Sequence, residues 1–587
     1  MAEYRNPQNE PGSEKRLLLI FLISFVFMLL AQPLLKKYFP TPPPPQKIAQ
    51  TEQTPPAPPA TKPTSSAHAT PSAPAATKQA GAETETVVES DLYRVTFTNR
   101  GAQVKSWILK KFDNDAETGK LDLVNPTAAP QYGYPLSLWT YDEELRGRLN
   151  SALYVATQDG RQITFEYSDQ DLTVRKVFKF DDTYVVKVDA SVTYKGSPKE
   201  SLVAWPSGFG DQTSPAFYAS SLLAYQFNKN IERVSPRCGF SPISKCTQVI
   251  GGGTVPGPFH WAGPTDQYFA VVFIPDDPVA ASMVTLNHSM PVPKDSSKPD
   301  SKDTVNVDVI GAAVGNLHGP ISERLFAGPK ELEVLQKIPV PGVSGADNDL
   351  NGLVDFGWLG IIAKPLFVWL RWTYHHVIPN WGWAIVLQTL IISLALLPLR
   401  ITQMKSMLKM QRVAPQIKSI QEKYKKYSLR DPRKAAMNEE IAALYKKEGV
   451  NPAGGCLPLL IQMPFLFAYY RMLSAALDLR HAHWLWIHDL SAPDPIYILP
   501  ILMVISSLVT QRMTPQAGMD PAQQRMMNVM MPLMMGFIFF RLQAGLNLYY
   551  AVVNLISIAQ QAVMNRTSLG REMREMMAKR ARKKASS

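Results

Sequence analysis

The segment VIPNWGWAIVLQTLIISLALLPL, from Val377 to Leu399, contains no charged residue. A helix needs about 20 predominantly apolar residues to cross a bilayer, and this segment is long enough. Similar uncharged stretches follow toward the end of the chain. The sequence therefore predicts a multi-pass α-helical membrane protein, with crossings in its second half at residues 377–399, 453–477, 495–511, 526–540 and 542–565.

An earlier apolar segment, Leu17–Leu35, has 19 uncharged residues and follows Lys15 and Arg16. A cleavable secretory signal also begins with basic residues, but its apolar core has only about 7–15 residues and a small-x-small cleavage pattern follows it. The flank AQPLLKK at 31–37 lacks that pattern. We interpret residues 17–35 as an uncleaved signal anchor, which brings the number of crossings to six.

The distribution of Lys and Arg sets the orientation, because these residues accumulate on the cytoplasmic side. Residues 400–456 contain thirteen of them and residues 566–587 contain eight, whereas residues 478–495 contain only Arg480. We therefore expect the following cytoplasmic segments: the N-terminus 1–16, the region 400–448, the loop 512–525 and the tail 566–587. The insert 87–345 and the loop 478–494 are then outside.

The overall composition of the 587 residues hides this arrangement. The chain is 45% apolar and 19% charged, with a mean hydropathy of −0.10, which is typical of a soluble protein. Its formal charge of +12 is compatible with nucleic acid or anionic lipid as a partner. Three cysteines exclude a disulfide scaffold and a cysteine-rich metal module.

A linker and a soluble domain follow the anchor. Residues 36–86 include twelve prolines between Pro40 and Pro74, a composition that favours an extended spacer. From residue 87 apolar residues alternate with polar ones, for example at Tyr93, Val95 and Phe97. This period of two predicts a large antiparallel β-sandwich over 87–345. We expect a short helix to close it, with an apolar face formed by Leu332, Val334 and Leu335.

The soluble domain shows no catalytic constellation. Cys238 and Cys246 lie eight residues apart, in what we expect to be an oxidising compartment. They either form a disulfide or remain two reduced cysteines.

Two helical segments border the second crossing. Residues 355–376 combine Trp and Tyr with Lys364 and Arg371, as expected for a helix in the membrane interface. Residues 400–448 have apolar residues at helical spacing, and Asp431-Pro432 divides them into a helical hairpin. Pro415 should kink or restart its first helix. The apolar stripes either only pack the two helices together, or the hairpin also docks a partner through its basic outer faces.

Polar residues inside the expected crossings indicate a function. They are Gln388, Thr389, Ser393, Gln462, Arg471, Asn528 and Asn554. Each can form an interhelical hydrogen bond, but several together indicate a hydrated cavity. Arg471 either extends to the outer interface or supplies a cation to that cavity.

Six methionines between Met526 and Met535 form either an adaptable apolar surface or ordinary lipid-facing packing. We find no metal-ligand cluster, phosphate-binding loop or nucleophile–base pair in this half. The closely spaced His481, His483 and His488 lie beside tryptophans and are better explained as interface residues. The sequence predicts no enzyme, cofactor or metal site.

Three segments resemble the YidC family of membrane protein insertases: GVNPAGGCLPLLIQMPFLFAYYRML (449–473), LWIHDLSAPDPIYILPILM (485–503) and GLNLYYAVVNLISIAQQ (545–561). Asn99-Arg100-Gly101-Ala102, Gly328-Pro329-Lys330 and Asp355-Phe356-Gly357-Trp358 resemble its Gram-negative form. The resemblance implies a five-helix insertase core and a periplasmic β-supersandwich similar to sugar-mutarotase folds. It also implies an inner-membrane protein that inserts nascent membrane proteins, alone or with the Sec translocon.

The resemblance further implies a hydrophilic groove for client proteins. We expect its residues to be Gln388, Ser393, Gln462, Phe467, Tyr470, Arg471, Met530, Met534 and Asn554. The family usually has an arginine where this chain has Ser393, so the cation of the groove is missing there. We hypothesise that Arg471 replaces it.

The expected partners are nascent membrane proteins, the Sec translocon and the ribosome, which the hairpin and the tail would contact. The tail 566–587 is equally compatible with a basic amphipathic helix on anionic lipid. Two other classes of protein are the alternatives to this interpretation. A solute transporter should show paired ionisable groups or internal repeats, and the sequence shows neither; a membrane-anchored carbohydrate-binding protein is the other.

Overall fold

The computed structural model describes residues 77–210, 212, 214–227, 230–236, 251–294, 301–317, 319–343, 348–424, 427, 433–450, 457–513, 531–568, 571 and 575. All belong to one compact unit, formed by 77–236 and 249–587. The predicted anchor, most of the linker, both cysteines of the possible disulfide, Met530 and most of the tail lie outside the described residues. So does the side chain of Gln462.

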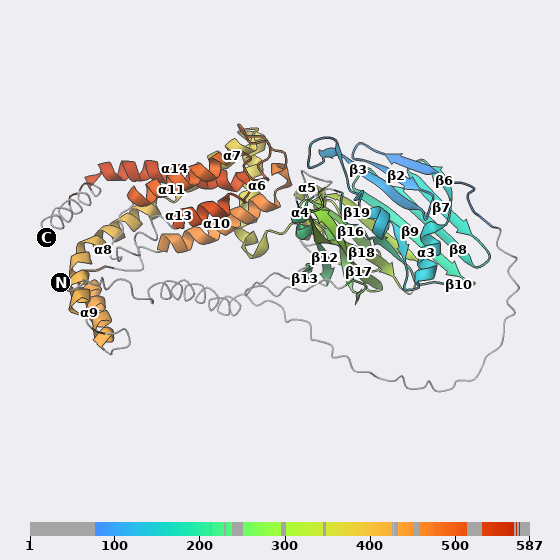
Figure 1. The fold of residues 1–587 in the computed structure, drawn as a ribbon, viewed down its shortest axis with the longest axis horizontal. Coiled ribbons are helices and arrows are strands. Elements are labelled where there is room, and N and C mark those ends of the chain that lie inside the picture. Colours follow the sequence, from blue (N-terminus) through green and yellow to red (C-terminus); the bar gives the residue numbers. More distant parts are fainter. Residues whose placement is uncertain are drawn as a thin grey trace. The chain divides into compact units, whose positions relative to one another are not determined.

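The strands lie between residues 85 and 329, and the longer helices follow from residue 360 (Figure 1). A four-stranded sheet has the order β1-β2-β3-β4, with β1 (Glu85–Glu89), β2 (Tyr93–Thr98), β3 (Gln103–Asp113) and β4 (Lys120–Asp122). Each neighbouring pair is antiparallel.

The largest sheet has ten strands, in the order β13-β12-β15-β16-β19-β9-β8-β7-β6, with β10 paired to β9. Its strands are β6 (Val155–Asp159), β7 (Gln162–Ser168), β8 (Leu172–Phe180), β9 (Val185–Tyr194), β10 (Ser197–Pro198), β12 (Leu222–Phe227), β13 (Asn230–Val234), β15 (Phe259–Thr265), β16 (Phe269–Pro275) and β19 (Ile321–Pro329).

The third sheet has the order β14-β17-β18-β11-β5. Its strands are β5 (Ser137–Trp139), β11 (Leu202–Trp205), β14 (Thr254–Pro256), β17 (Ala281–Pro293) and β18 (Thr304–Asn316). In the described part of the domain, four short helices accompany the sheets: α2 (Ala129–Tyr132), α3 (Glu143–Ser151), α4 (Pro215–Ser220) and α5 (Leu332–Leu335). The prediction of a β-rich domain is confirmed.

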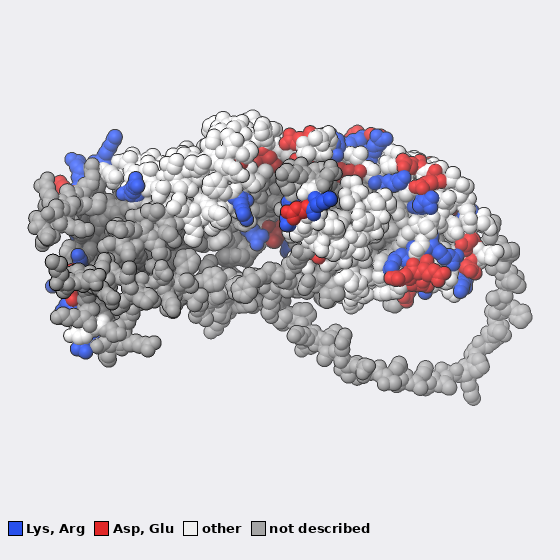
Figure 2. Space-filling view, viewed as in Figure 1, with Lys and Arg blue, Asp and Glu red and all other residues white. Residues whose placement is uncertain are grey.

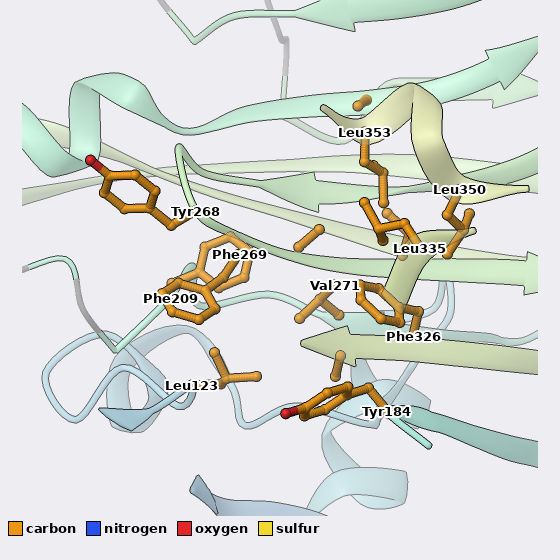
Figure 3. Close-up of a cluster of buried hydrophobic side chains, with 14 of the residues drawn as sticks. Leu123, Tyr184, Phe209, Tyr268, Phe269, Val271, Phe326, Leu335, Leu350 and Leu353 are labelled. Atoms are coloured by element: carbon orange, nitrogen blue, oxygen red, sulfur yellow. The ribbon is translucent and has the colours of Figure 1, made fainter. Parts of the chain in front are cut away.

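The alternating pattern positions the core of this domain. In β2, Tyr93, Val95 and Phe97 are buried while Arg94 is exposed. Figure 3 shows one region of the core, where Phe269 and Phe326 lie among side chains from several strands and loops. Helix α5 adds Leu335 to this cluster, in agreement with the expected apolar face.

The domain extends beyond its predicted limits of 87 and 345. Before β1, the amide of Lys78 donates to the Ser168 carbonyl at 2.9 Å, so residues predicted as linker already belong to the fold. After α5, the 3-10 helix η1 (Leu350–Leu353) adds Leu350 and Leu353 to the core (Figure 3). Periodicity missed both ends, because an isolated β-bridge between Lys78 and Ser168 and one short helical turn hold them rather than a regular strand.

Glu323 in β19 is a carboxyl group inside the core, with 1% of its surface exposed. Among the described residues neither of its carboxylate oxygens has a hydrogen-bond partner. Lys187, the cation that acts on it, is already bonded to Asp276 and Ser322. Burial therefore raises the pKa of Glu323 well above its ordinary value of 4.5.

We predict that Glu323→Gln makes the stability of the domain less dependent on pH. In the wild type the folded state holds a proton that the unfolded state releases above pH 4.5, so stability falls as pH rises, by about 1.4 kcal/mol per pH unit until the folded pKa is reached. The thermal midpoint of the variant, relative to that of the wild type, should rise from pH 5 to pH 8. The exposed Glu117→Gln is the control, and a constant difference would contradict the prediction.

The helical part consists of η2 (Gly357–Leu359), α6 (Gly360–His376), α7 (Trp381–Ala395), α8 (Leu397–Lys423), α9 (Arg433–Lys447), α10 (Leu457–Ala475), η4 (Leu477–Leu479), α11 (Ile498–Met513), α13 (Met531–Phe539) and α14 (Ala544–Arg566). Helix α14 packs against α7 and α11, and α6 packs against α7 and α10. In the part of the chain that the structure describes, no helix has both the length and the apolar character needed to cross a membrane.

The uncharged segment 377–399 forms a shorter helix than its length suggests. The Asn380 side chain accepts a hydrogen bond from the Trp383 amide at 3.1 Å and caps the start of α7. Helix α7 ends at Ala395, and Pro398 lies in the first turn of α8. Local capping and proline thus set the ends of this helix, which charge counting cannot detect.

Helices α8 and α9 pack against each other. Val413 and Ile417 of α8 are buried against Ile441 and Leu444 of α9. Helix α8 continues through Pro415, so it does not restart there. The lysines at 405, 409, 418, 446 and 447 remain exposed.

Candidate functional site

The interior of the helical part contains a connected chain of polar and aromatic side chains. Gln388 of α7 is fully buried, with 0% exposure. Its amide nitrogen donates to the Leu366 carbonyl of α6 at 2.9 Å, and its amide oxygen accepts from the Tyr469 hydroxyl of α10 at 2.9 Å. Tyr469 stacks on Tyr549 of α14, with ring centroids 4.0 Å apart. These contacts join four helices.

Ser393 lies two residues before the end of α7 and is only 5% exposed. Its carbonyl accepts a hydrogen bond from the Gln560 side chain of α14 at 3.3 Å. The end of α7 is therefore held against the last part of α14. Ser393 itself carries no charge.

Arg400, in the first turn of α8, lies close to this position. Its Nη1 donates to the Ser557 hydroxyl of α14 at 2.6 Å, and Ser557 in turn donates to the Val553 carbonyl at 2.6 Å. Sequence reasoning missed Arg400 because it counted this residue among the charges of the hairpin. The available signal was its spacing of seven residues, two helical turns, from Ser393.

Arg471 lies elsewhere. Its side chain is 49% exposed, and its Nη1 lies 3.9 Å from the Asp355 carboxylate, just before η2. Neither Gln388 nor Ser393 contacts it through a hydrogen bond in the described part of the chain. The structure does not bring Arg471 to the place where the groove cation was expected.

The other expected groove residues divide into two groups. Phe467 and Tyr470 of α10 and Met534 of α13 have exposed side chains. Asn554 of α14 donates to the Ser506 hydroxyl of α11 at 3.2 Å, which is an interhelical hydrogen bond. Gln462 and Met530 fall outside the described side chains.

The outer faces of the helices contrast with this interior. Large apolar side chains are exposed on α7, α11 and α13, among them Leu390, Ile391, Leu394, Ile501, Ile505, Leu533 and Phe537. In the face shown in Figure 2, the described atoms of the helical part include few charged side chains, whereas the β domain displays both signs. Polar groups inside and apolar groups outside are the arrangement expected of a bundle in lipid.

The described residues offer no group of three or more His, Cys, Asp or Glu side chains that could hold a metal ion.

Two family models match adjacent parts of the sequence. The model described as "60Kd inner membrane protein" matches residues 372–571, and the model described as "YidC periplasmic domain" matches residues 85–369. A crystal structure of an active YidC insertase with its first transmembrane domain resolved has 20% sequence identity and a TM-score of 0.35. That match covers 84% of this chain and 95% of the solved one.

The relatives include a membrane protein insertase YidC from Cupriavidus pinatubonensis, 48% identical over 244 residues. The alignment covers 41% of this chain and 41% of the relative. The alignment with the protein of the same name from Cupriavidus taiwanensis covers 56% of that relative, so the chain spans about half the length of these two proteins. The protein of the same name from Geobacter sp. is 32% identical over 508 residues, which are 82% of this chain and 86% of the relative. The chain therefore belongs to the YidC family of membrane protein insertases.

Proposed function

We propose that the chain inserts nascent proteins into the inner membrane and assists their folding, without covalent chemistry or nucleotide hydrolysis. The observation that carries the proposal is the polar chain from Gln388 to Tyr549, enclosed by helices whose outer faces are apolar. A polar segment that crosses pure hydrocarbon leaves its backbone and side chains without hydrogen-bond partners, at a cost of several kcal/mol per group. A polar interior lowers that cost, and burial of the client's apolar helix in lipid then drives insertion.

The proposed path has a polar and an apolar side. The polar flank of the client rests near Gln388, Ser393 and Gln462, with Asn554 on the side of α11. The apolar part leaves over Phe467, Tyr470, Met530 and Met534. The exposure of the described members of this second set supports their place on the path.

For the arrangement in the membrane we propose six crossings, of which five form the insertase core. Residues 87–345 are periplasmic, and both ends of the chain are cytoplasmic. The asymmetry of Lys and Arg along the sequence supports this orientation. Helix α7, with 15 residues, is about 22 Å long, so the bilayer must thin around it, which shortens the path of a client.

The partners that we propose are the Sec translocon, the ribosome and anionic lipids. The hairpin of α8 and α9 uses its apolar stripes internally and presents lysines outward. Phosphate-rich RNA at the ribosome would bind such a surface through release of counterions.

We predict that the combined replacement of Lys405, Lys409, Lys418 and Lys446 by Gln weakens ribosome binding at least tenfold at low salt, because four phosphate contacts are lost. Co-sedimentation with ribosomes in a neutral detergent measures this. The chain truncated to residues 1–565 separates the tail from the hairpin. Wild-type binding by the quadruple variant would rule out the hairpin as a ribosome contact.

A membrane-anchored carbohydrate-binding protein is the alternative, and a deletion distinguishes the two. Removing residues 86–331 eliminates every described strand and retains α5 and the helical part. An insertase should keep much of its insertion activity in proteoliposomes, whereas a sugar-binding protein would lose its function entirely. Complete loss of insertion by a deletion variant that still folds in the membrane would contradict the proposed function.

A further inference from the structure

The C-terminal end of α10 is held by a side chain from the β domain. The last four carbonyls of a helix have no partner within the helix. One of these in α10, the Ser474 carbonyl, accepts a hydrogen bond from Nε2 of Gln267 at 3.0 Å. Gln267 lies in the turn between β15 and β16, 207 residues earlier in the chain. The β domain therefore supplies a cap for a helix of the helical part.

Arg480 connects the same two regions in the opposite direction. It directly follows the 3-10 helix η4, and its side chain is only 5% exposed. Its Nη1 donates to the Asp113 carbonyl at the end of β3 at 2.8 Å, and its guanidinium lies 5.6 Å from the ring centroid of Phe269 in β16. The Asp115 carboxylate lies 3.9 Å from its Nη2. A buried arginine of the helical part is thus bound by the β domain.

The residues between these two contacts are also fixed. Ala476, Leu477 and Leu479 are 1%, 6% and 0% exposed, and they belong to the same core cluster as Phe269. The β domain therefore holds the whole segment from the end of α10 to Arg480. We call the two polar contacts, Gln267 with Ser474 and Arg480 with Asp113, the joint.

The helix that the joint holds also carries part of the proposed exit, Phe467 and Tyr470. Tyr470 lies five residues before the end of α10 at Ala475, about 7.5 Å along the helix. Its carbonyl is the regular helical partner of the Ser474 amide, so fraying of the last turn would release the backbone at Tyr470. A helix end without its cap frays more readily, because its terminal carbonyls lose their partners.

We propose that the joint keeps the last turn of α10 folded and thereby positions the exit surface at Phe467 and Tyr470 for the apolar segment of a client. Gln267 and Arg480 are then positioning residues for insertion. The inference rests on the proposed function. Because the joint positions a helix and does not form the path, its loss weakens insertion without abolishing it.

Hydrogen exchange of the full-length protein in a neutral detergent tests the first step. Gln267→Glu keeps the shape of the side chain but removes the donor and places a negative charge at a helix C-terminus. Exchange of the amides in 472–480 should become about tenfold faster, the equivalent of one hydrogen bond. Gln267→Lys, which still donates and carries a favourable charge for a helix C-terminus, should exchange nearly as the wild type does.

The arginine has its own variant and a matched control. Arg480→Gln should also accelerate exchange in 472–480 about tenfold, because it removes a charge-assisted hydrogen bond. Arg541→Gln is the control. Arg541 lies in the turn between α13 and α14, is exposed, and also has its guanidinium over a phenylalanine ring, at 5.8 Å. Its substitution should leave exchange in 472–480 unchanged.

Photo-crosslinking to a stalled client separates positioning from mere stability. In Gln267→Glu, adducts from Tyr470 to the hydrophobic segment should fall about fivefold, whereas adducts from Ser393 to the polar flank should not change. Because coupling between two sites is reciprocal, a bound client should slow exchange in 472–480 of the wild type.

Unchanged exchange in Gln267→Glu, or faster exchange with wild-type adducts from Tyr470, would overturn the inference and leave the insertase function intact. The Gln267 variants decide the question even if Arg480→Gln does not fold. Absence of client adducts from both Ser393 and Tyr470 in the wild type would instead refute the proposed function.

Discussion

Lys176→Met should lower the free energy of unfolding of the β domain by about 3–5 kcal/mol. Lys176 is fully buried in β8, with 0% exposure, and its ammonium donates to the carbonyls of Gly101, Ala102 and Leu136 at 3.0, 2.7 and 2.7 Å. All three acceptors belong to residues with positive φ, two of which are not glycine. The lysine therefore stabilises strained turns, and Met would leave three buried carbonyls unpaired.

The measurement is the thermal midpoint of the full-length protein, followed by the loss of β-sheet circular dichroism. Lys179→Met, on an exposed position of the same strand, is the control. Burial lowers the pKa of Lys176 from 10.5 to about 7. The unfolded state therefore binds the proton more tightly between pH 7 and 10.5, and wild-type stability should gain from this group as pH rises through that range. A midpoint of Lys176→Met within one degree of the control would contradict the role of this lysine.

The second large effect concerns the interior of the helical part. Gln388→Leu combined with Tyr469→Phe should lower insertion of clients with polar exported flanks more than tenfold, because it removes two linked polar groups from the proposed path. Folding should change little, since both partners of a buried hydrogen bond are replaced together by apolar groups of similar shape. The Leu366 carbonyl that Gln388 also bonds lies within helix α6.

Insertion into proteoliposomes and thermal stability should be measured on the same preparations. Ser506→Ala, which removes a buried hydroxyl between α11 and α14, is the matched control and should insert clients at nearly the wild-type rate. Normal insertion by the double variant would show that the polar interior is not the path.

Much of the fold follows from local patterns in the sequence. The alternation of Tyr93, Val95 and Phe97 predicted a strand with one buried face, and β2 has that face. The same reasoning fails where an ionisable residue occupies an inward position. Hydrogen-bond partners compensate the burial of Lys176, and protonation compensates the burial of Glu323. Both compensations depend on residues distant in the sequence.

The candidate site was predictable only in part. Gln388 and Ser393 stood out as polar residues in an uncharged segment, and the structure buries both. The partners that connect them, Tyr469 and Gln560, come from other helices and have no local signal. Arg400 was counted with the hairpin because it directly follows the uncharged segment 377–399. The hydrogen bond to Ser557 that turns it inward depends on how α8 meets α14.

Site-specific photo-crosslinking to ribosome-stalled nascent chains tests whether clients pass through the polar interior. The photoreactive residue is placed at Ser393 or Ser557 inside, at Phe467 or Tyr470 on the proposed exit, and at the exposed Ile505 of α11 as the control. We predict adducts from Ser393 and Ser557 to the polar flank of a short stalled chain, and adducts from Phe467 and Tyr470 to the hydrophobic segment as the chain lengthens. Adducts of equal yield from Ile505 at every length, with none from Ser393 and Ser557, would contradict passage through the polar interior.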